Sequence, residues 1–138
     1  MNDCRGKLAA TVLVLRPAGM PQGWEQTGLW ASAAAIPGVT VRADAGGEAA
    51  RRFGAATSGQ ALLYATNGHL LFSGGITEAR GHEGDNAGRS AVAALVLGAG
   101  QSNVLEAPVY GCPLFDDRPL RASPPEGQSE RSTACPTK

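Results

Sequence analysis

The sequence contains few cysteine, histidine and aromatic residues, and its positive and negative charges are balanced. Its 138 residues include three cysteines, two histidines, two tryptophans, two tyrosines and three phenylalanines. No two cysteines lie within three residues of each other, which excludes a zinc site built from paired CxxC motifs and a dense disulfide scaffold. Because 12 basic side chains balance 12 acidic ones, composition indicates neither a nucleic-acid partner nor an anionic membrane surface.

Long apolar runs are also missing. The first apolar run, residues 8–15, follows Arg5 and Lys7 and stops at Arg16. It is far too short to span a bilayer, and no small-x-small cleavage site follows it. We therefore interpret it as a buried strand, and we expect no membrane segment and no export signal in this chain.

Residues 116–138 carry no apolar periodicity and contain four prolines among Ser, Arg and Glu. Such a stretch buries too little surface to offset the entropy lost on ordering. The sequence therefore predicts one domain over residues 1–115 and a disordered tail over 116–138, with Cys135 inside the tail.

The most specific local pattern is a pair of apolar runs, 61–65 and 69–73, on either side of Asn67-Gly68. An Asn-Gly pair suits the positive φ angles of a tight hairpin turn, so these runs are predicted to be antiparallel strands. Two further β-rich runs lie upstream, at 9–15 and 39–43.

Three helices are expected between and after these strands. The predicted bounds are 24–36, ended by Pro37-Gly38; 48–53, ended by Gly54; and a third helix from Asp85 or Asn86 to Gly98. The resulting order, β-α-β-α-β-β-α, predicts an α/β fold whose mixed sheet has a parallel part and an antiparallel edge.

This order resembles the C-terminal part of a thioredoxin-like domain, over residues 8–98. The resemblance rests mainly on EAARRFG at 48–54 and ATSGQ at 56–60 ahead of the hairpin. A narrower set of motifs resembles the bacterial RedB-type thioredoxin-like proteins: 57–59, 72–77, 80–82, 84–88 and 110–113. The resemblance implies a three-layer thioredoxin-like fold, thiol-disulfide chemistry with a protein partner, no cofactor, and a full-length form that is extracytoplasmic and membrane-anchored.

The family's Cys-Pro-Cys motif is absent, and the loop 16–23 contains no cysteine. Either 9–15 is the redox strand and its loop has lost the thiols, or 9–15 is the strand after the redox helix and the chain begins too late. The second interpretation is favoured, because the family places a segment like 12–17 after that helix. The sheet should then be defective between 9–15 and 61–65, where the redox strand would lie. The chain itself should be inactive, and a non-functional gene fragment is a further alternative.

The resemblance also assigns candidate site residues. Thr57, Ser58 and Gly59 would form the substrate-facing loop, with Gly59 where the family has a cis-proline. Cys112 and Cys4 are weak redox candidates, and the structural alternative makes Cys112 a thiol that packs the last ordered segment against the body.

A second candidate site is the loop 74–88, which is rich in glycine and polar groups and leads into a helix N-terminus. Arg80, His82, Asp85 and Asn86 would bind an anion, a metal or a partner protein in a non-catalytic binding module. No spacing rule supports a metal site. In the structural alternative Asp85 caps the helix and Arg80 pairs with a neighbouring carboxylate.

Overall fold

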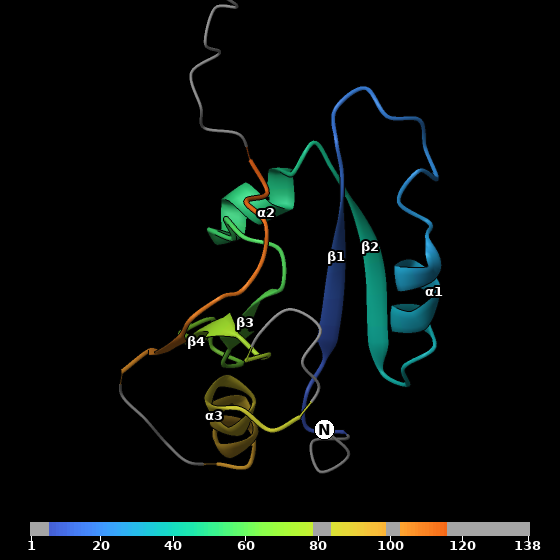
Figure 1. Ribbon diagram of the computed structural model, residues 1–138. Coiled ribbons are helices and arrows are strands. Elements are labelled where there is room, and N and C mark those ends of the chain that lie inside the picture. Colours follow the sequence, from blue (N-terminus) through green and yellow to red (C-terminus); the bar gives the residue numbers. More distant parts are fainter. Residues whose placement is uncertain (1–5, 79–83, 99–102, 116–138) are drawn as a thin grey trace, which may run out of the picture.

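The computed structural model describes residues 6–78, 84–98 and 103–115 (Figure 1). Cys4, Cys135 and the predicted tail lie outside these ranges. The predicted element order is confirmed, and one short strand follows it. The elements are β1 (Ala10–Arg16), α1 (Gly28–Ala34), β2 (Val39–Ala45), α2 (Glu48–Phe53), β3 (Gln60–Tyr64), β4 (Leu70–Gly75), α3 (Ala87–Val96) and β5 (Leu105–Ala107).

The first sheet consists of β1 and β2, which pair in parallel from Ala10 opposite Val39 to Arg16 opposite Ala45. Parallel neighbours need a crossover connection, and α1 with its preceding loop provides it. Figure 1 shows α1 beside β2, on the side away from the second sheet. The predicted parallel part of the fold is therefore present.

Helix α1 is shorter than the predicted helix 24–36, which is a correction at its N-terminal end. Trp24 lies in a series of turns, in which its N–H donates to the Pro21 carbonyl (3.2 Å) and the Gln26 N–H donates to the Gly23 carbonyl (3.0 Å). Proline and a glycine at φ 93° favour these turns over a continuous helix. Trp24 therefore lies outside α1, whereas Trp30 lies within it.

The second sheet contains the predicted hairpin. Strands β3 and β4 are antiparallel, and β5 pairs with β4 in parallel. In the turn, Gly68 has φ +86° and the His69 N–H donates to the Asn67 side-chain oxygen (3.1 Å). The hairpin and the position of its turn are confirmed, but only Gly68 of the Asn-Gly pair has a positive φ angle. Helix α3 packs against β4 and β5.

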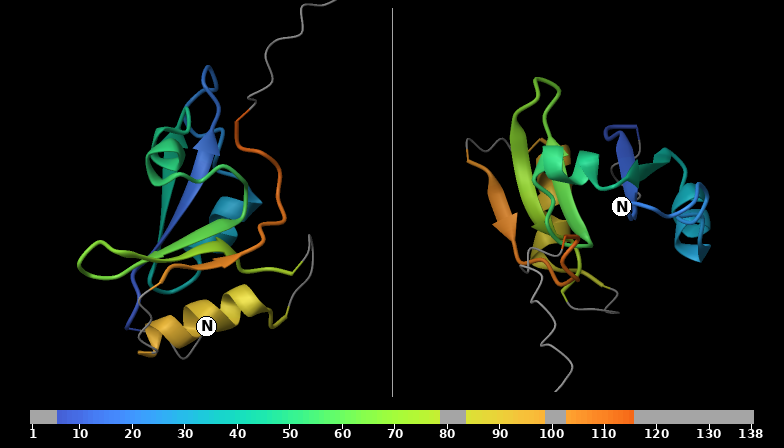
Figure 2. Two further views of the ribbon diagram at one scale, coloured as in Figure 1. Left: turned by 90° about the vertical axis from the view of Figure 1, so that its left-hand side faces the viewer. Right: turned by 90° about the horizontal axis from the view of Figure 1, so that it is seen from above.

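The two sheets do not join. Among the described residues, no strand pairs with the second edge of β1 or of β3. Figure 2, seen from above, shows β3 as the strand of its sheet that lies nearest to β1. The expected single mixed sheet is therefore divided into a parallel pair and a mixed three-stranded sheet. The division lies between strands β1 and β3, where a defect was predicted.

The apolar core of the described residues is small. Its buried members are Ala33, Ala50, Leu63 and Phe72, and only Phe72 is fully enclosed. Large apolar side chains that stay exposed occur throughout: Leu13, Met20, Trp24, Leu29, Ile36, Phe53, Tyr64, Leu97, Val104 and Tyr110. Leu63 and Phe72, the two large side chains of the core, both belong to the second sheet, so the first sheet has little core of its own.

Candidate functional site

The start of α2 is fixed by Asp44, a buried carboxylate at the end of β2. Its two oxygens accept hydrogen bonds from the backbone N–H groups of Ala49 (2.9 Å) and Ala50 (2.8 Å). A helix leaves its first N–H groups without internal partners, and Asp44 satisfies two of them. This cap ties the start of α2 to the end of β2 and thus to the first sheet.

The loop after α2 is shaped by Gly54 and Gln60. Gly54 takes φ +70°, which ends the helix, and the Ala55 N–H turns back to the Ala50 carbonyl (2.8 Å). The Gln60 side-chain oxygen then accepts from the Ala56 N–H (3.1 Å), and the Gln60 N–H donates to the Thr57 carbonyl (3.3 Å). Residues 56–60 are thereby held as a turn at the start of β3.

A segment near the C-terminal end of the described chain, residues 111–114, pairs with this loop. Its central contacts join Ser58 and Cys112: the Ser58 N–H donates to the Cys112 carbonyl (2.9 Å), and the Cys112 N–H donates to Ser58 Oγ (2.9 Å). The Leu114 N–H donates to the Ala56 carbonyl (2.8 Å), and Thr57 and Pro113 form an antiparallel bridge. The segment therefore lies on the loop as a short extended strand.

Glycine makes this approach possible. A Cβ on Gly111 would collide with the Ser58 carbonyl oxygen, a backbone atom that has no freedom to move away. Gly111 is thus required for the contact that fixes the neighbouring Cys112. We did not predict this role from the sequence, although a glycine directly before a candidate cysteine could have indicated that another segment of the backbone lies close to it.

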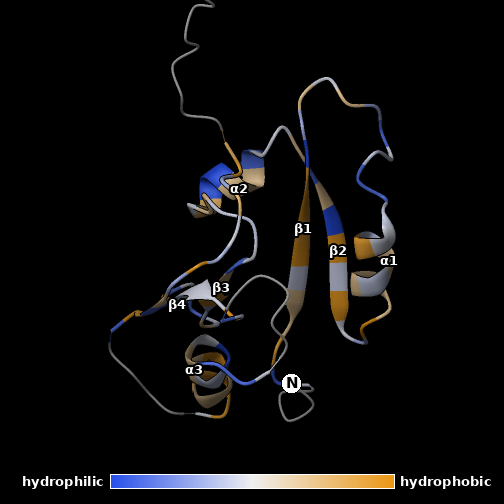
Figure 3. Ribbon diagram, viewed as in Figure 1, coloured by the Kyte–Doolittle hydropathy of each residue, from blue (hydrophilic) through white to orange (hydrophobic). Residues whose placement is uncertain are grey.

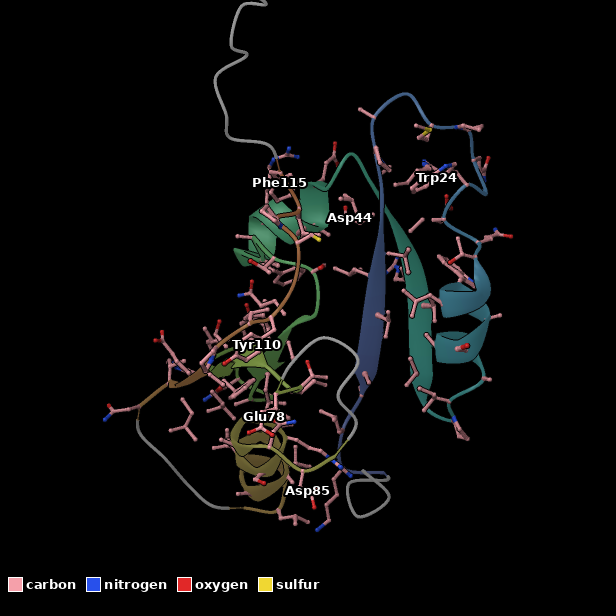
Figure 4. All side chains as sticks on the ribbon, viewed as in Figure 1. Trp24, Asp44, Glu78, Asp85, Tyr110 and Phe115 are labelled. Carbon is pink, nitrogen blue, oxygen red and sulfur yellow. The ribbon has the colours of Figure 1, made fainter. Side chains whose placement is uncertain are left out.

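The end of the segment is anchored on α2. The Arg51 guanidinium lies 3.9 Å above the centre of the Phe115 ring, and it also donates to the Gly46 carbonyl (2.6 Å). Gly47 leaves room for that ring, because a Cβ there would meet it. Figure 4 shows Phe115 against α2 and Tyr110 beside the second sheet, so the segment 103–115 runs from one to the other.

The structure thus brings together four of the candidate site residues: Thr57, Ser58 and Gly59 on the loop, and Cys112 on the segment that pairs with it. Cys112 is exposed, and Gly59 has φ +80°. Cys4 lies outside the described residues. The site thus places a thiol and two hydroxyl groups at one end of the second sheet.

The loop 74–88 is described only in part, since Arg80 and His82 lie outside the described ranges. Asn86 caps α3: its Oδ1 accepts from the Arg89 N–H (2.9 Å), and its Nδ2 donates to the Ile76 carbonyl (2.7 Å). Asp85 pairs with Arg89 at 2.9 Å. Of the two predicted N-caps the structure has Asn86, so the alternative in which Asp85 caps the helix is wrong. Ligand binding by this loop stays a prediction.

Two features of the described residues bear on the remaining expectations. They contain no group of three His, Cys, Asp or Glu side chains arranged to hold a metal ion. None of their helices has the length and apolar character needed to cross a membrane.

No family model matches the chain, and neither the curated proteins nor the solved structures compared with it include a match.

Proposed function

We propose that this chain is a thioredoxin-like domain of the RedB type that lacks the strand and helix bearing the redox cysteines. Its complete form would act in thiol-disulfide exchange with a protein partner, outside the cytoplasm and anchored to a membrane. The observation that carries the proposal is the divided sheet: β1 and β3 are neighbours in space, yet no described strand lies between them. A thioredoxin-like domain has its redox strand at that place.

The element order supports the same assignment. A short helix ended by glycine, a tight loop, an antiparallel hairpin and a closing helix follow one another as α2, 55–59, β3–β4 and α3. In thioredoxin-like domains the loop before the hairpin contacts the substrate through its main chain. Here the Ser58 N–H donates to the Cys112 carbonyl, so the main chain of this loop pairs with an extended segment of the same chain.

Cys112 fits this proposal as the thiol next to the substrate-facing loop. In thiol-disulfide exchange a thiolate attacks one sulfur of a disulfide, a new S–S bond forms, and the other sulfur leaves as a thiolate. The reaction needs an attacking thiolate and a second thiol to resolve the mixed disulfide. The sequence contains no CxxC or CxC pair, so the chain alone should be inactive as a thioredoxin.

Reduction of insulin disulfides by dithiothreitol tests this inactivity. The unaltered chain and a Cys4→Ser/Cys112→Ser variant should both leave the uncatalysed rate unchanged. Catalysis that persists in the double variant would contradict the proposal, because the activity would then come from outside the candidate thiols.

A gain-of-function experiment tests the fold assignment. The chain is extended at its N-terminus by a strand and a helix that begins with Cys-Pro-Cys, and a matched Ser-Pro-Ser extension is the control. The cysteine form should reduce insulin and the serine form should not. If both extended proteins unfold cooperatively and neither is active, the thioredoxin-like assignment is wrong.

A further inference from the structure

The turn of the β3–β4 hairpin holds the one asparagine of the sequence that is followed by glycine. Of the four asparagines, Asn67 precedes Gly68, whereas Asn86 precedes alanine, Asn103 precedes valine and the fourth precedes aspartate. The backbone nitrogen of the next residue is a nucleophile that can attack an asparagine side chain, and a side chain on that residue crowds the attack. Because glycine has no side chain, Asn67 is the least hindered of the four.

The structure adds two conditions that favour this attack. Asn67 and Gly68 are both exposed, so water reaches the reacting groups. The Asn67 Oδ1 accepts from the His69 N–H (3.1 Å), which holds the side-chain amide beside the backbone that follows it. This hydrogen bond also draws electron density away from the carbonyl carbon of the amide. The carbon to be attacked is therefore activated and kept on the side of the Gly68 nitrogen.

The closed turn restrains the nucleophile. The Gly68 N–H donates to the Ala65 carbonyl (2.9 Å), and the Ala65 N–H donates to the His69 carbonyl (2.8 Å). These backbone hydrogen bonds lie at the exposed end of a hairpin, where breaking them needs a local opening and not the unfolding of the whole chain. Opening of the turn therefore controls access to the Gly68 nitrogen.

We propose that Asn67 is a site of spontaneous deamidation, reached through local opening of the hairpin turn. The deprotonated Gly68 nitrogen forms a bond to Asn67 Cγ, and the side-chain nitrogen leaves as ammonia, which closes a succinimide ring. Water then opens the ring at either of its carbonyl groups. One opening gives aspartate, and the other gives isoaspartate, in which the main chain runs through Cγ. Either product consumes one water, releases one ammonia and adds one negative charge.

The isoaspartyl product should loosen the end of the hairpin. It adds one carbon atom to the main chain of the turn, and the length of a hairpin turn fixes the pairing of its strands. The bond between Ala65 and His69 lies next to the turn and should break first. Farther along the strands, Leu63 and Phe72 are buried, and β4 packs against α3, whose mainly apolar character Figure 3 shows. The effect should therefore stay at the turn.

The test incubates the full chain in mildly alkaline buffer and follows the replacement of NH2 by OH at each asparagine by peptide mass spectrometry. Enzymatic methylation of the free carboxyl group counts the isoaspartate. Asn103 is the matched control, because it is exposed like Asn67 but is followed by Val104, whose branched side chain crowds the attack. In Asn86 both polar atoms of the side-chain amide are hydrogen-bonded. Asn67 should react at least about tenfold faster than either.

Comparable rates at Asn67 and Asn103 would overturn the proposal, since exposure alone would then account for the reaction. An Asn67→Gln variant should stay unmodified at position 67, because its longer side chain would have to close a larger ring. Urea below the unfolding transition distinguishes local from global opening. It raises the population of the globally unfolded chain, so a rate at Asn67 that rises in proportion would place the reaction in that state and overturn the role of the turn. A constant rate supports local opening.

Hydrogen exchange of the purified isoaspartyl form tests the effect on the hairpin. The Ala65 amide should exchange at least about tenfold faster than in the unmodified chain, because it loses its acceptor. The Leu114 amide, bonded to Ala56, should be unchanged. Unchanged exchange of Ala65 would contradict the loosening of the turn. The inference needs no thiol and does not rest on the thioredoxin-like proposal, so the two can fail separately.

Discussion

Asp44 shows how one buried side chain joins two elements. It is 5% exposed, and both of its oxygens are used by backbone N–H groups at the start of α2. Its neighbours in the sequence, on β2, belong to the first sheet, whereas the helix it caps leads to the loop of the candidate site. Loss of this carboxylate should therefore affect more than the helix itself.

We expect Asp44→Ala to lower the free energy of unfolding by about 2 kcal/mol, because two N–H groups lose their acceptor and one of them is buried. The matched control is Asp85→Ala. Asp85 is 89% exposed and pairs only at the surface, so its loss should cost less than about 0.5 kcal/mol. Urea unfolding measures both, and equal effects would contradict the role assigned to Asp44.

For Gly88 in α3, we predict that substitution by alanine changes the stability in the direction opposite to the one that helix propensity predicts. Gly→Ala inside a helix normally stabilises it by about 1 kcal/mol. A Cβ on Gly88, however, would collide with the backbone carbonyl oxygen of Gly75 in β4. We expect Gly88→Ala to destabilise the protein by roughly 1–3 kcal/mol through this overlap.

The control for Gly88 is Ser90→Ala, at an exposed position of the same helix. It should leave the stability unchanged or raise it by a few tenths of a kcal/mol, as propensity alone predicts. Thermal unfolding distinguishes the two variants. A Gly88→Ala protein with a raised melting temperature would show that α3 does not lie this close to β4.

At the scale of elements, the features that short stretches of sequence determine, such as helix ends and tight turns, were predicted correctly. The bounds of helix 48–53 were predicted because Gly54 ends it, and the hairpin because Asn67-Gly68 suits its turn. Strand β5 was missed because three residues are too few to show a period. The pairing of Ser58 with Cys112 joins residues far apart in the sequence, and no local pattern encodes it.

The segment 103–115 depends on glycines at its contacts with the second sheet. Gly111→Ala should lift residues 111–114 from the loop, because the added Cβ would overlap the Ser58 carbonyl. The amides of Ser58 and Leu114 should then exchange at least about tenfold faster, since both lose backbone acceptors. The Ala65 amide, bonded to His69 in the hairpin, should be unaffected.

Gly28→Ala is the matched control for this variant, since a Cβ at Gly28 meets no atom within 4 Å. It should leave the exchange of Ser58 and Leu114 unchanged. Unchanged exchange in Gly111→Ala as well would mean that the segment pairs with the loop in a way that does not need glycine.

At the scale of the whole molecule, the distribution of buried side chains predicts two levels of stability. Phe72 is fully buried and Leu63 is 8% exposed, and both belong to the second sheet. β1, by contrast, has no fully buried residue, and its second edge is unpaired among the described residues. The first sheet should therefore open at lower free energy than the second.

Native-state hydrogen exchange in low urea measures this difference. The amides at the centres of β3 and β4 should exchange only through global unfolding, whereas those of β1 and β2 should exchange through an earlier, partial opening. Phe72→Ala should lower the global free energy by about 3–5 kcal/mol, and Leu13→Ala, at a 40% exposed position, should have a much smaller effect. If both sheets instead exchange with one free energy, then the contacts of α2, through its Asp44 cap and the Arg51–Phe115 stacking, are strong enough to make the divided sheets one cooperative unit.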